Sequence, residues 1–247
     1  MRVRVLTYNI HRAIGLDRRF RPERIVRVLE RYAADVVLLQ EVDEGVPRSR
    51  EVDLARELAQ ALGYRHWAVG HNVSLRKGRY GNATLSRHRI LSERNIDLTV
   101  GLWRRRGCQH TAIALERRAV RRRLDVFNLH LGLSARERER QVSMLARSRE
   151  LADLPGDAPC LVGGDFNDWR SRLAPLFTEW LRFRCATDRS HEGGRPILTY
   201  PSFFPGGGLD RIYYRGPLRL LEARRCRLRV SRVASDHLPV IADFELD

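Results

Sequence analysis

The sequence of 247 residues is poor in lysine, poor in cysteine and free of long apolar runs. No apolar stretch approaches the roughly 20 residues that a membrane-spanning helix needs. The first residues enter a strand-like alternation directly, without the apolar core or small-residue cleavage site of a secretory signal. We therefore expect a cytoplasmic protein without a transmembrane segment.

The four cysteines lie far apart in the chain and form no C-x-x-C pair; they are Cys108, Cys160, Cys185 and Cys226. This spacing argues against a disulfide framework and against a cysteine-based zinc site, and it favours buried, reduced thiols. The eight histidines show no H-E-x-x-H pattern. The common signature of zinc hydrolases is therefore missing.

Basic residues outnumber acidic ones by 46 to 30, which gives a formal net charge of +16. Lys77 is the single lysine, so 45 of the 46 basic residues are arginines. Such an excess attracts nucleic acid, anionic lipid headgroups or phosphorylated small molecules. The codon bias of a GC-rich genome is an equally good explanation. Both interpretations stay open, because net charge concerns partners and solubility and says nothing about fold.

The apolar pattern predicts one domain over 1–247, in which strands alternate with helices before a strand-rich end. Apolar residues at helical spacing predict helices over 22–32, 54–62 and 134 to about 151. Continuous apolar runs predict strands covered on both faces over 35–40, 124–129 and 158–163. Further strands are expected over 210–215, 218–230 and 239–246.

Polar residues with catalytic or metal-binding chemistry stand at the ends of most of these strands. They are Asn9, Glu41, Asn128, His130, Asp165, Asn167, Asp210, Asp236 and His237. Taken singly, each has an ordinary explanation as a turn former, an arginine partner or a structural histidine. Their recurrence at successive strand ends is harder to explain by turns alone, because the rim of a sheet is where sites are built.

Six segments that carry these residues occur in order across nearly the whole chain. They are Tyr8-Asn9, Leu39-Gln40-Glu41-Val42, Asn128-Leu129-His130-Leu131, Gly164-Asp165-Phe166-Asn167, Leu209-Asp210-Arg211-Ile212 and Ser235-Asp236-His237-Leu238-Pro239-Val240. As a set they resemble the endonuclease/exonuclease/phosphatase superfamily, which includes deoxyribonucleases, abasic-site endonucleases, inositol-polyphosphate 5-phosphatases and neutral sphingomyelinases. The resemblance implies a four-layered α/β sandwich of two packed, mostly antiparallel sheets with helices outside. The site is expected at one edge of the sandwich.

The resemblance implies a Mg²⁺ site, with Mn²⁺ as a substitute. Glu41 and the amide oxygen of Asn9 offer the hard oxygen ligands that Mg²⁺ prefers, and Asp236 completes the site or supports it from behind. Asp165, oriented by the amide of Asn167, is the candidate to position or deprotonate the attacking water.

The phosphate is expected to lie between two histidines. His237, held in one tautomer by Asp210, would bond a phosphoryl oxygen, and His130 would contact the phosphate from the other side. Asn82 lies in the segment 80–87, which resembles a family strand that lines the pocket. Asn82 and Asn167 are further candidates for a phosphate contact.

Of two departures from the abasic-endonuclease pattern, the first concerns the geometry of the metal site and the second weakens a role in DNA repair. His11 stands where some of those enzymes carry an aspartate that helps to hold the metal. The segment 199–204 reads Thr-Tyr-Pro-Ser-Phe-Phe, where those enzymes have a tryptophan-rich segment.

Three functions stay open. The first is a Mg²⁺-dependent nuclease or phosphodiesterase acting on nucleic acid, favoured by the arginine clusters at 104–106 and 121–123, which are equally well explained as solvated strand edges. The second is a hydrolase of a phospholipid or inositol-type headgroup, peripheral to an anionic membrane, whose 203–208 loop would touch the bilayer. The third is an inactive binding module that retains the fold.

Overall fold

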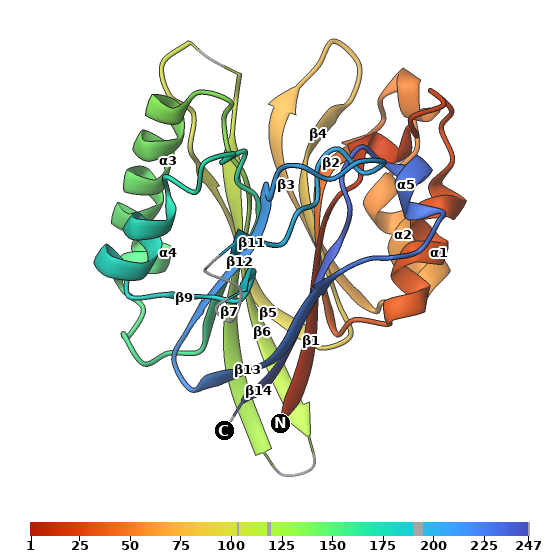
Figure 1. Cartoon of the computed structure of the whole chain (residues 1–247). Coiled ribbons are helices and arrows are strands. Elements are labelled where there is room, and N and C mark those ends of the chain that lie inside the picture. Colours follow the sequence, from red (N-terminus) through yellow and green to blue (C-terminus); the bar gives the residue numbers. More distant parts are fainter. Residues whose placement is uncertain (103, 118–119, 190–194, 247) are drawn as a thin grey trace.

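The computed structural model describes residues 1–102, 104–117, 120–189 and 195–246. Two six-stranded sheets pack face to face, and helices cover their outer faces (Figure 1). The first sheet has the order β13 (Leu218–Arg225), β14 (Val240–Leu246), β1 (Arg2–Asn9), β2 (Val36–Glu44), β4 (Arg79–Ser86) and β3 (His66–Ser74). The second has the order β5 (Arg89–Asp97), β6 (Gly107–Arg117), β7 (Val120–His130), β8 (Cys160–Asp165), β12 (Asp210–Arg215) and β9 (Arg184–Cys185). The predicted four-layered sandwich is confirmed.

Each sheet contains one parallel pair of strands at its centre, and its other pairs are antiparallel. In the first sheet β1 runs parallel to β2, with Asn9 beside Gln40. In the second β7 runs parallel to β8, with His130 beside Asp165. Parallel neighbours end at the same edge of a sheet, so the polar residues that finish these four strands gather at one edge. This site edge lies opposite the chain termini in Figure 1.

The layer between the two sheets changes from apolar to polar toward the site edge. Its apolar part contains Val5, Leu38, Val126 and Leu161, which pack in one cluster. Side chains two residues further along these strands share the same face. At those positions β1, β2 and β7 carry Thr7, Gln40 and Asn128, all fully buried.

Buried polar groups need hydrogen-bond partners, and the two sheets supply them to each other. Gln40 Nε2 donates to Asn128 Oδ1 at 2.7 Å. Asn128 Nδ2 donates to the carbonyl oxygens of Leu39 at 3.1 Å and Ala83 at 3.0 Å. These bonds fix the second sheet against the first directly behind the site.

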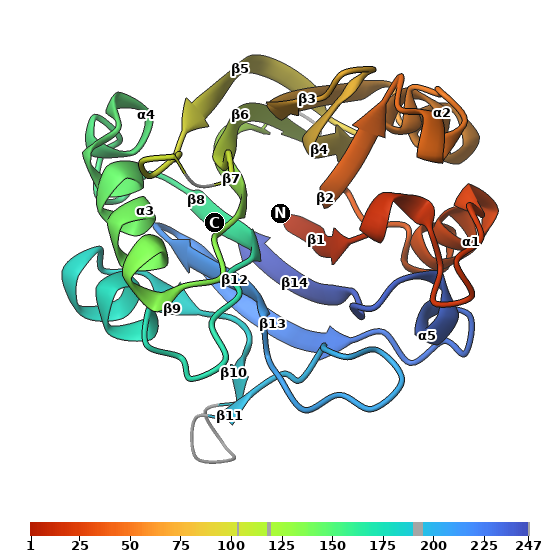
Figure 2. The same ribbon diagram turned by 90° about the horizontal axis from the view of Figure 1, so that it is seen from above.

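The helices occupy the two outer layers (Figure 2). Beside the first sheet lie α1 (Pro22–Tyr32), α2 (Leu54–Leu62), α5 (Ser231–Ala234) and the short turns η1 (His11–Ala13) and η2 (Pro47–Ser49). Beside the second lie α3 (Ala135–Arg147), α4 (Arg149–Ala152) and η3 (Leu176–Trp180). A separate pair of strands, β10 (Asp188–Arg189) and β11 (Arg195–Pro196), completes the described elements. No helix among the described residues is both long and apolar enough to cross a membrane.

The helices predicted over 22–32 and 54–62 are confirmed with the same bounds. The helix expected from 134 to about 151 is interrupted at Ser148, whose ψ of 143° is extended and whose hydroxyl donates to the Leu145 carbonyl. A serine side chain that bonds the backbone in this way competes with the helical ladder. The strand expected over 218–230 ends earlier, at Arg225.

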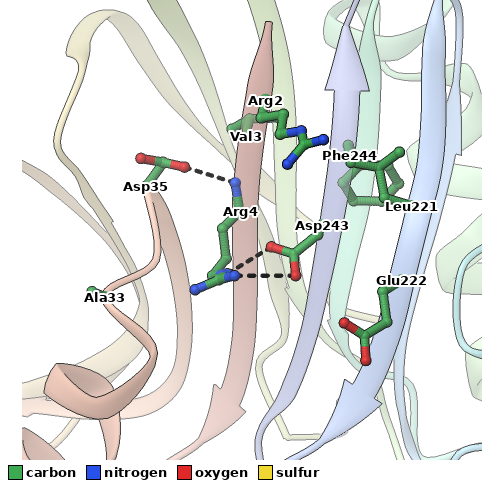
Figure 3. Close-up of a pocket in the computed structure, with 9 residues that line it drawn as sticks. All are labelled: Arg2, Val3, Arg4, Ala33, Asp35, Leu221, Glu222, Asp243 and Phe244. Atoms are coloured by element: carbon green, nitrogen blue, oxygen red, sulfur yellow. Dashed lines mark hydrogen bonds and ion pairs between the residues drawn. The ribbon is translucent and has the colours of Figure 1, made fainter.

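A hollow of about 500 Å³ near the start of β1 lies far from the site edge (Figure 3). Its polar groups mostly bond one another. Arg4 Nε donates to Asp243 Oδ1 at 2.6 Å, and the Arg4 main-chain N–H donates to Asp35 Oδ2 at 2.7 Å. Arg224 Nη1 also donates to Asp243, at 2.9 Å. We therefore assign this hollow to fold stability.

The replacement of Gly164 by alanine is expected to destabilise the protein strongly. Gly164 has φ +144°, and a Cβ there would collide with the Leu129 carbonyl oxygen of the neighbouring strand β7. We expect the free energy of unfolding, measured by urea denaturation, to fall by more than about 2 kcal/mol. Gly156→Ala is the matched control, because no atom of the part of the chain that the structure describes lies within 4 Å of its added Cβ. Equal stability of the two variants would contradict the close approach of β7 and β8.

Replacing Asp243 by asparagine is expected to weaken the fold at neutral pH and to have less effect in acid. Partial burial raises the pKa of Asp243, but hydrogen bonds from Arg4 and Arg224 outweigh it and lower that pKa below its usual value. The resulting stabilisation is present above the unfolded pKa of about 3.8 and is lost as the pH falls through the folded value. Asp243→Asn should therefore cost about 1 kcal/mol at pH 7 in urea denaturation, and the difference should shrink below pH 4. A pH-independent difference would contradict this assignment.

Candidate active site

Asp165, the last residue of β8, lies at the centre of the site edge and is buried. Asn9 Nδ2 donates to its Oδ2 at 3.0 Å, and the Asn167 main-chain N–H donates to its Oδ1 at 3.0 Å. The Nε2 atoms of His130 and His237 lie 3.5 Å and 3.6 Å from the same Oδ2. One carboxylate thus joins residues from both sheets.

Burial raises the pKa of Asp165 to about 6, although the nearby His237 opposes this change. Desolvation disfavours the charged form of a buried carboxyl, whereas a neighbouring imidazolium favours it. A carboxyl with such a pKa is a better proton acceptor near neutral pH than an exposed aspartate.

His237 is held by Asp210, as the sequence pattern suggests. The Nδ1 atom of His237 lies 2.9 Å from Asp210 Oδ2, and the Thr199 hydroxyl donates to that same oxygen at 2.5 Å. Burial lowers the pKa of His237, but Asp210 and Asp165 together outweigh burial and raise it to about 10. His237 is therefore an imidazolium near neutral pH, with Nδ1–H directed at Asp210 and Nε2–H near Asp165.

His130 lies on the other side of Asp165 from His237. Unlike the charged His237, it is neutral near neutral pH. Burial, assisted by the positive charges of Arg106 and His237, lowers the pKa of His130 well below its usual value. Near neutral pH the carboxylate therefore lies between a neutral imidazole and a charged one. This asymmetry gives the two histidines different chemical capacities.

Glu41 reaches the site edge through an irregularity in β2. The pairing of β2 with β4 shifts between Leu39 and Val42, and Glu41 has a φ of 57°. Positive φ is unfavourable for a glutamate, and such strain is concentrated at functional sites. Glu41 Oε2 lies 3.1 Å from Arg12 Nε, and Arg12 also has a positive φ, of 61°.

The segments that carry the three expected metal ligands lie side by side. The N–H of Ile10 donates to the Gln40 carbonyl, which places the residue after Asn9 next to the residue before Glu41. The Ser235 hydroxyl donates to the Asn9 carbonyl at 2.7 Å and lies 3.3 Å from Asp236 Oδ1.

The donor set at this edge fits a hard divalent cation. Glu41 and Asp236 carry carboxylates, and the Asn9 amide oxygen accepts a hydrogen bond from the His11 N–H at 3.1 Å. Carboxylate and amide oxygens are the ligands that Mg²⁺ prefers. Asp165, Asp210 and His237 also place one potential ligand atom each within 4.8 Å of one another. Asp210 Oδ1 is buried and has no hydrogen-bond partner among the described residues, as expected of an oxygen that faces a cation or a donor from outside the chain.

Two predicted phosphate-contacting amides are engaged with the main chain. Asn82 Nδ2 donates to the carbonyl oxygens of Gly107 at 3.2 Å and Asn128 at 3.1 Å, between the sheets. Asn167 Nδ2 donates to the Leu131 carbonyl at 2.9 Å, so it is the main-chain N–H of Asn167 that orients Asp165. Phosphate contacts from Asn82 and Asn167 stay predictions.

Several residues at the site had no individual role predicted from the sequence, although Arg106 belongs to the arginine cluster 104–106 and Thr199 and Tyr200 to the segment 199–204. Arg12 and Arg106 place positive charge near His130, and Thr199 supports Asp210. The ring of Tyr200 lies 4.9 Å from that of His237. The one sequence feature that could have pointed to Arg106 is its place at the end of an arginine cluster directly before β6.

Residues 6–237 match the Endonuclease/Exonuclease/phosphatase family. The chain belongs to this family. The resemblance based on the six segments is thereby confirmed. The family acts on phosphate esters and is typically dependent on divalent metal ions. The chain is 33% identical to the uncharacterized protein YbhP of Escherichia coli (strain K12), over 98% of this chain and 96% of YbhP.

Solved structures of the family share the fold. An endonuclease/exonuclease/phosphatase from Beutenbergia cavernae has a TM-score of 0.78 at 22% identity, over 99% of this chain and 72% of that one. The human Nocturnin catalytic domain with a bound sulfate anion also has a TM-score of 0.78, at 21% identity, over 100% of this chain and 94% of that one. ANGEL2, a 2',3'-cyclic phosphatase, has a TM-score of 0.75 at 19% identity, over 100% of this chain and 96% of that one.

Proposed function

We propose that this protein is a Mg²⁺-dependent hydrolase of phosphodiesters, with its reaction centre at Asp165. The observation that carries the proposal is the position of Asp165 Oδ2, within 3.6 Å of both His130 Nε2 and His237 Nε2. A base between two imidazoles suits a reaction in which water attacks phosphorus while negative charge grows on the phosphoryl oxygens.

Each residue has a defined part in this proposal. Asp165 accepts the proton of the attacking water, and Asn9 and the Asn167 N–H hold its carboxylate in place. His237 donates a hydrogen bond from Nε2 to a phosphoryl oxygen, because Asp210 keeps it protonated. The neutral His130 contacts the phosphate from the opposite side.

Glu41, Asn9 and Asp236 would hold the Mg²⁺ ion, and Mn²⁺ would replace it. When bound, the ion supplies positive charge that neutralises the phosphoryl group. Arg12 and Arg106 add to this field from the protein itself, since both already depress the pKa of His130.

Nucleic acid is the first substrate class expected from the sequence, and the arginine excess supports it. Phospholipid headgroups present the same diester. Nucleic acids and phospholipids differ in the chemical groups that surround the phosphate. The protein surface around the site therefore distinguishes between the two substrate classes.

Replacing Asp165 or His237 by alanine is expected to abolish most of the activity. Removal of a general base or of a charged phosphoryl contact lowers the rate by about 10²–10⁴-fold. The measurement is steady-state hydrolysis of a chromogenic phosphodiester, with circular dichroism as a check on folding. Asp157→Ala and His88→Ala, in turns at the opposite edge, are the matched controls. Near-wild-type turnover in either site variant would refute the assigned roles.

Removal of divalent metal is expected to stop hydrolysis. EDTA should abolish turnover, and added Mg²⁺ or Mn²⁺ should restore it. Glu41→Gln should raise the Mg²⁺ concentration for half-maximal activity by about tenfold or more, because a neutral amide is a weaker ligand than a carboxylate. Undiminished hydrolysis in excess EDTA would exclude the metal-dependent mechanism, and an unchanged Mg²⁺ requirement in Glu41→Gln would remove Glu41 from the metal site.

A further inference from the structure

The most exposed apolar side chains of the described residues all lie on loops at the site edge. They are 56–106% exposed, and they are Leu102, Leu133, Trp169, Phe203 and Phe204. These residues follow or precede strands whose registers place the connecting loops at the same edge as Asn9 and Asp165. Isolated exposed apolar residues are ordinary on a protein surface, but a set of them around one site marks an interaction surface.

The opposite edge offers a comparison within the same molecule. None of its described turns contains a large apolar side chain that is exposed. Two further large apolar side chains have about half of their surface exposed. They are Leu91, in β5, and Trp180, the last residue of η3, directly before the turn 181–183. The apolar loop tips are therefore a property of the site edge.

Within the loops and turns, positive charge follows the same division between the edges. The described loops at the site edge contain 16 basic and 5 acidic residues over 10–21, 45–53, 75–78, 98–102, 104–106, 131–134, 166–175, 198–209 and 226–239. The described turns at the opposite edge contain 3 basic and 3 acidic residues over 33–35, 63–65, 87–88, 153–159, 181–183 and 216–217. The described loops at the site edge thus carry a formal net charge of +11, whereas the arginine cluster 121–123 lies in β7 near the opposite edge.

The two loops that carry the aromatic residues are held in place by Arg211, which is buried on β12. Its Nε donates to the Gly208 carbonyl at 2.9 Å, and its Nη2 donates to the Ser171 hydroxyl at 2.6 Å. Trp169 on one loop also packs edge-on against Tyr200 on the other, with their ring centroids 5.5 Å apart. A surface held in this way loses little conformational freedom when it binds a partner.

We propose that the site edge docks onto an anionic lipid bilayer, with Leu102, Leu133, Phe203 and Phe204 entering the headgroup region and the surrounding arginines meeting anionic headgroups. Aliphatic leucines on separate loops favour a bilayer over nucleic acid, because bases stack on aromatic rings and gain little from leucine. Docking in this orientation directs Asp165 toward the membrane surface. The further conclusion that the substrate is the phosphodiester of a lipid headgroup rests on the proposed function.

Vesicle sedimentation tests the docking separately from catalysis. Wild-type protein is mixed with vesicles of phosphatidylcholine alone, or of phosphatidylcholine with phosphatidylglycerol, at about 0.1 M salt. We expect binding to the anionic vesicles only, weakening as salt is added. Failure to bind anionic vesicles would overturn the proposal.

The double variant Phe203→Ser with Phe204→Ser should bind anionic vesicles about tenfold more weakly, because two apolar side chains no longer enter the membrane. Leu91→Ser and Trp180→Ser, similarly exposed but away from this edge, should bind like the wild type. All variants should hydrolyse a soluble chromogenic diester at the wild-type rate. Equal vesicle binding by the double variant and the controls would overturn the proposed orientation.

A parallel measurement with single-stranded oligonucleotide separates the two partner classes. Tighter binding to the oligonucleotide than to anionic vesicles, lost in the double variant, would replace the bilayer by a nucleic-acid platform. Vesicle binding without hydrolysis of the soluble diester would leave docking intact and refute the proposed function. Hydrolysis of the soluble diester without vesicle binding would support the proposed function and overturn the docking proposal.

Discussion

The hydrogen bond from Asn9 to Asp165 joins the two sheets at the point where the site is built. Each residue ends a strand of the parallel pair in its own sheet, and both are almost completely buried. A carboxylate that is removed from water must be compensated by donors and opposite charge. Residues from both sheets and from the loop before β14 supply that compensation, so the relative position of the sheets and the geometry of the site are set together.

The protonation states of the two histidines follow from this arrangement. Asp210 and Asp165 face His237 and hold it in the charged form, whereas Arg106 and the charge of His237 keep His130 neutral. A phosphodiester that enters the proposed site therefore meets a proton acceptor, a fixed cation and a neutral imidazole without rearrangement of the protein. Such preorganisation is the main source of electrostatic stabilisation in enzymes.

Stability and chemistry occupy opposite ends of the sandwich. Near the chain termini, Arg4, Asp35, Asp243 and Arg224 bond one another, and the space between the sheets is filled by apolar side chains. Toward the other end the same strands carry amides, carboxylates and imidazoles, and the loops beyond them expose apolar tips among arginines. We interpret this gradient along the strands as the reason why one small fold can combine a stable core with a polar site and the proposed docking surface.

The sequence by itself determined several of the strands, two helices and which polar residues stand at the ends of the central strands. Apolar periodicity reports which face of an element is buried, and residues such as Asp165 and His237 stand out because polar groups directly follow or precede apolar strands. Only the tertiary structure decided that the main-chain N–H of Asn167 orients Asp165, that Arg12 and Arg106 act on His130, and that exposed leucines and phenylalanines lie on loops at the site edge. These features depend on how loops that are distant in the sequence approach one another in space. Such contacts do not produce a periodic pattern of residues along the chain.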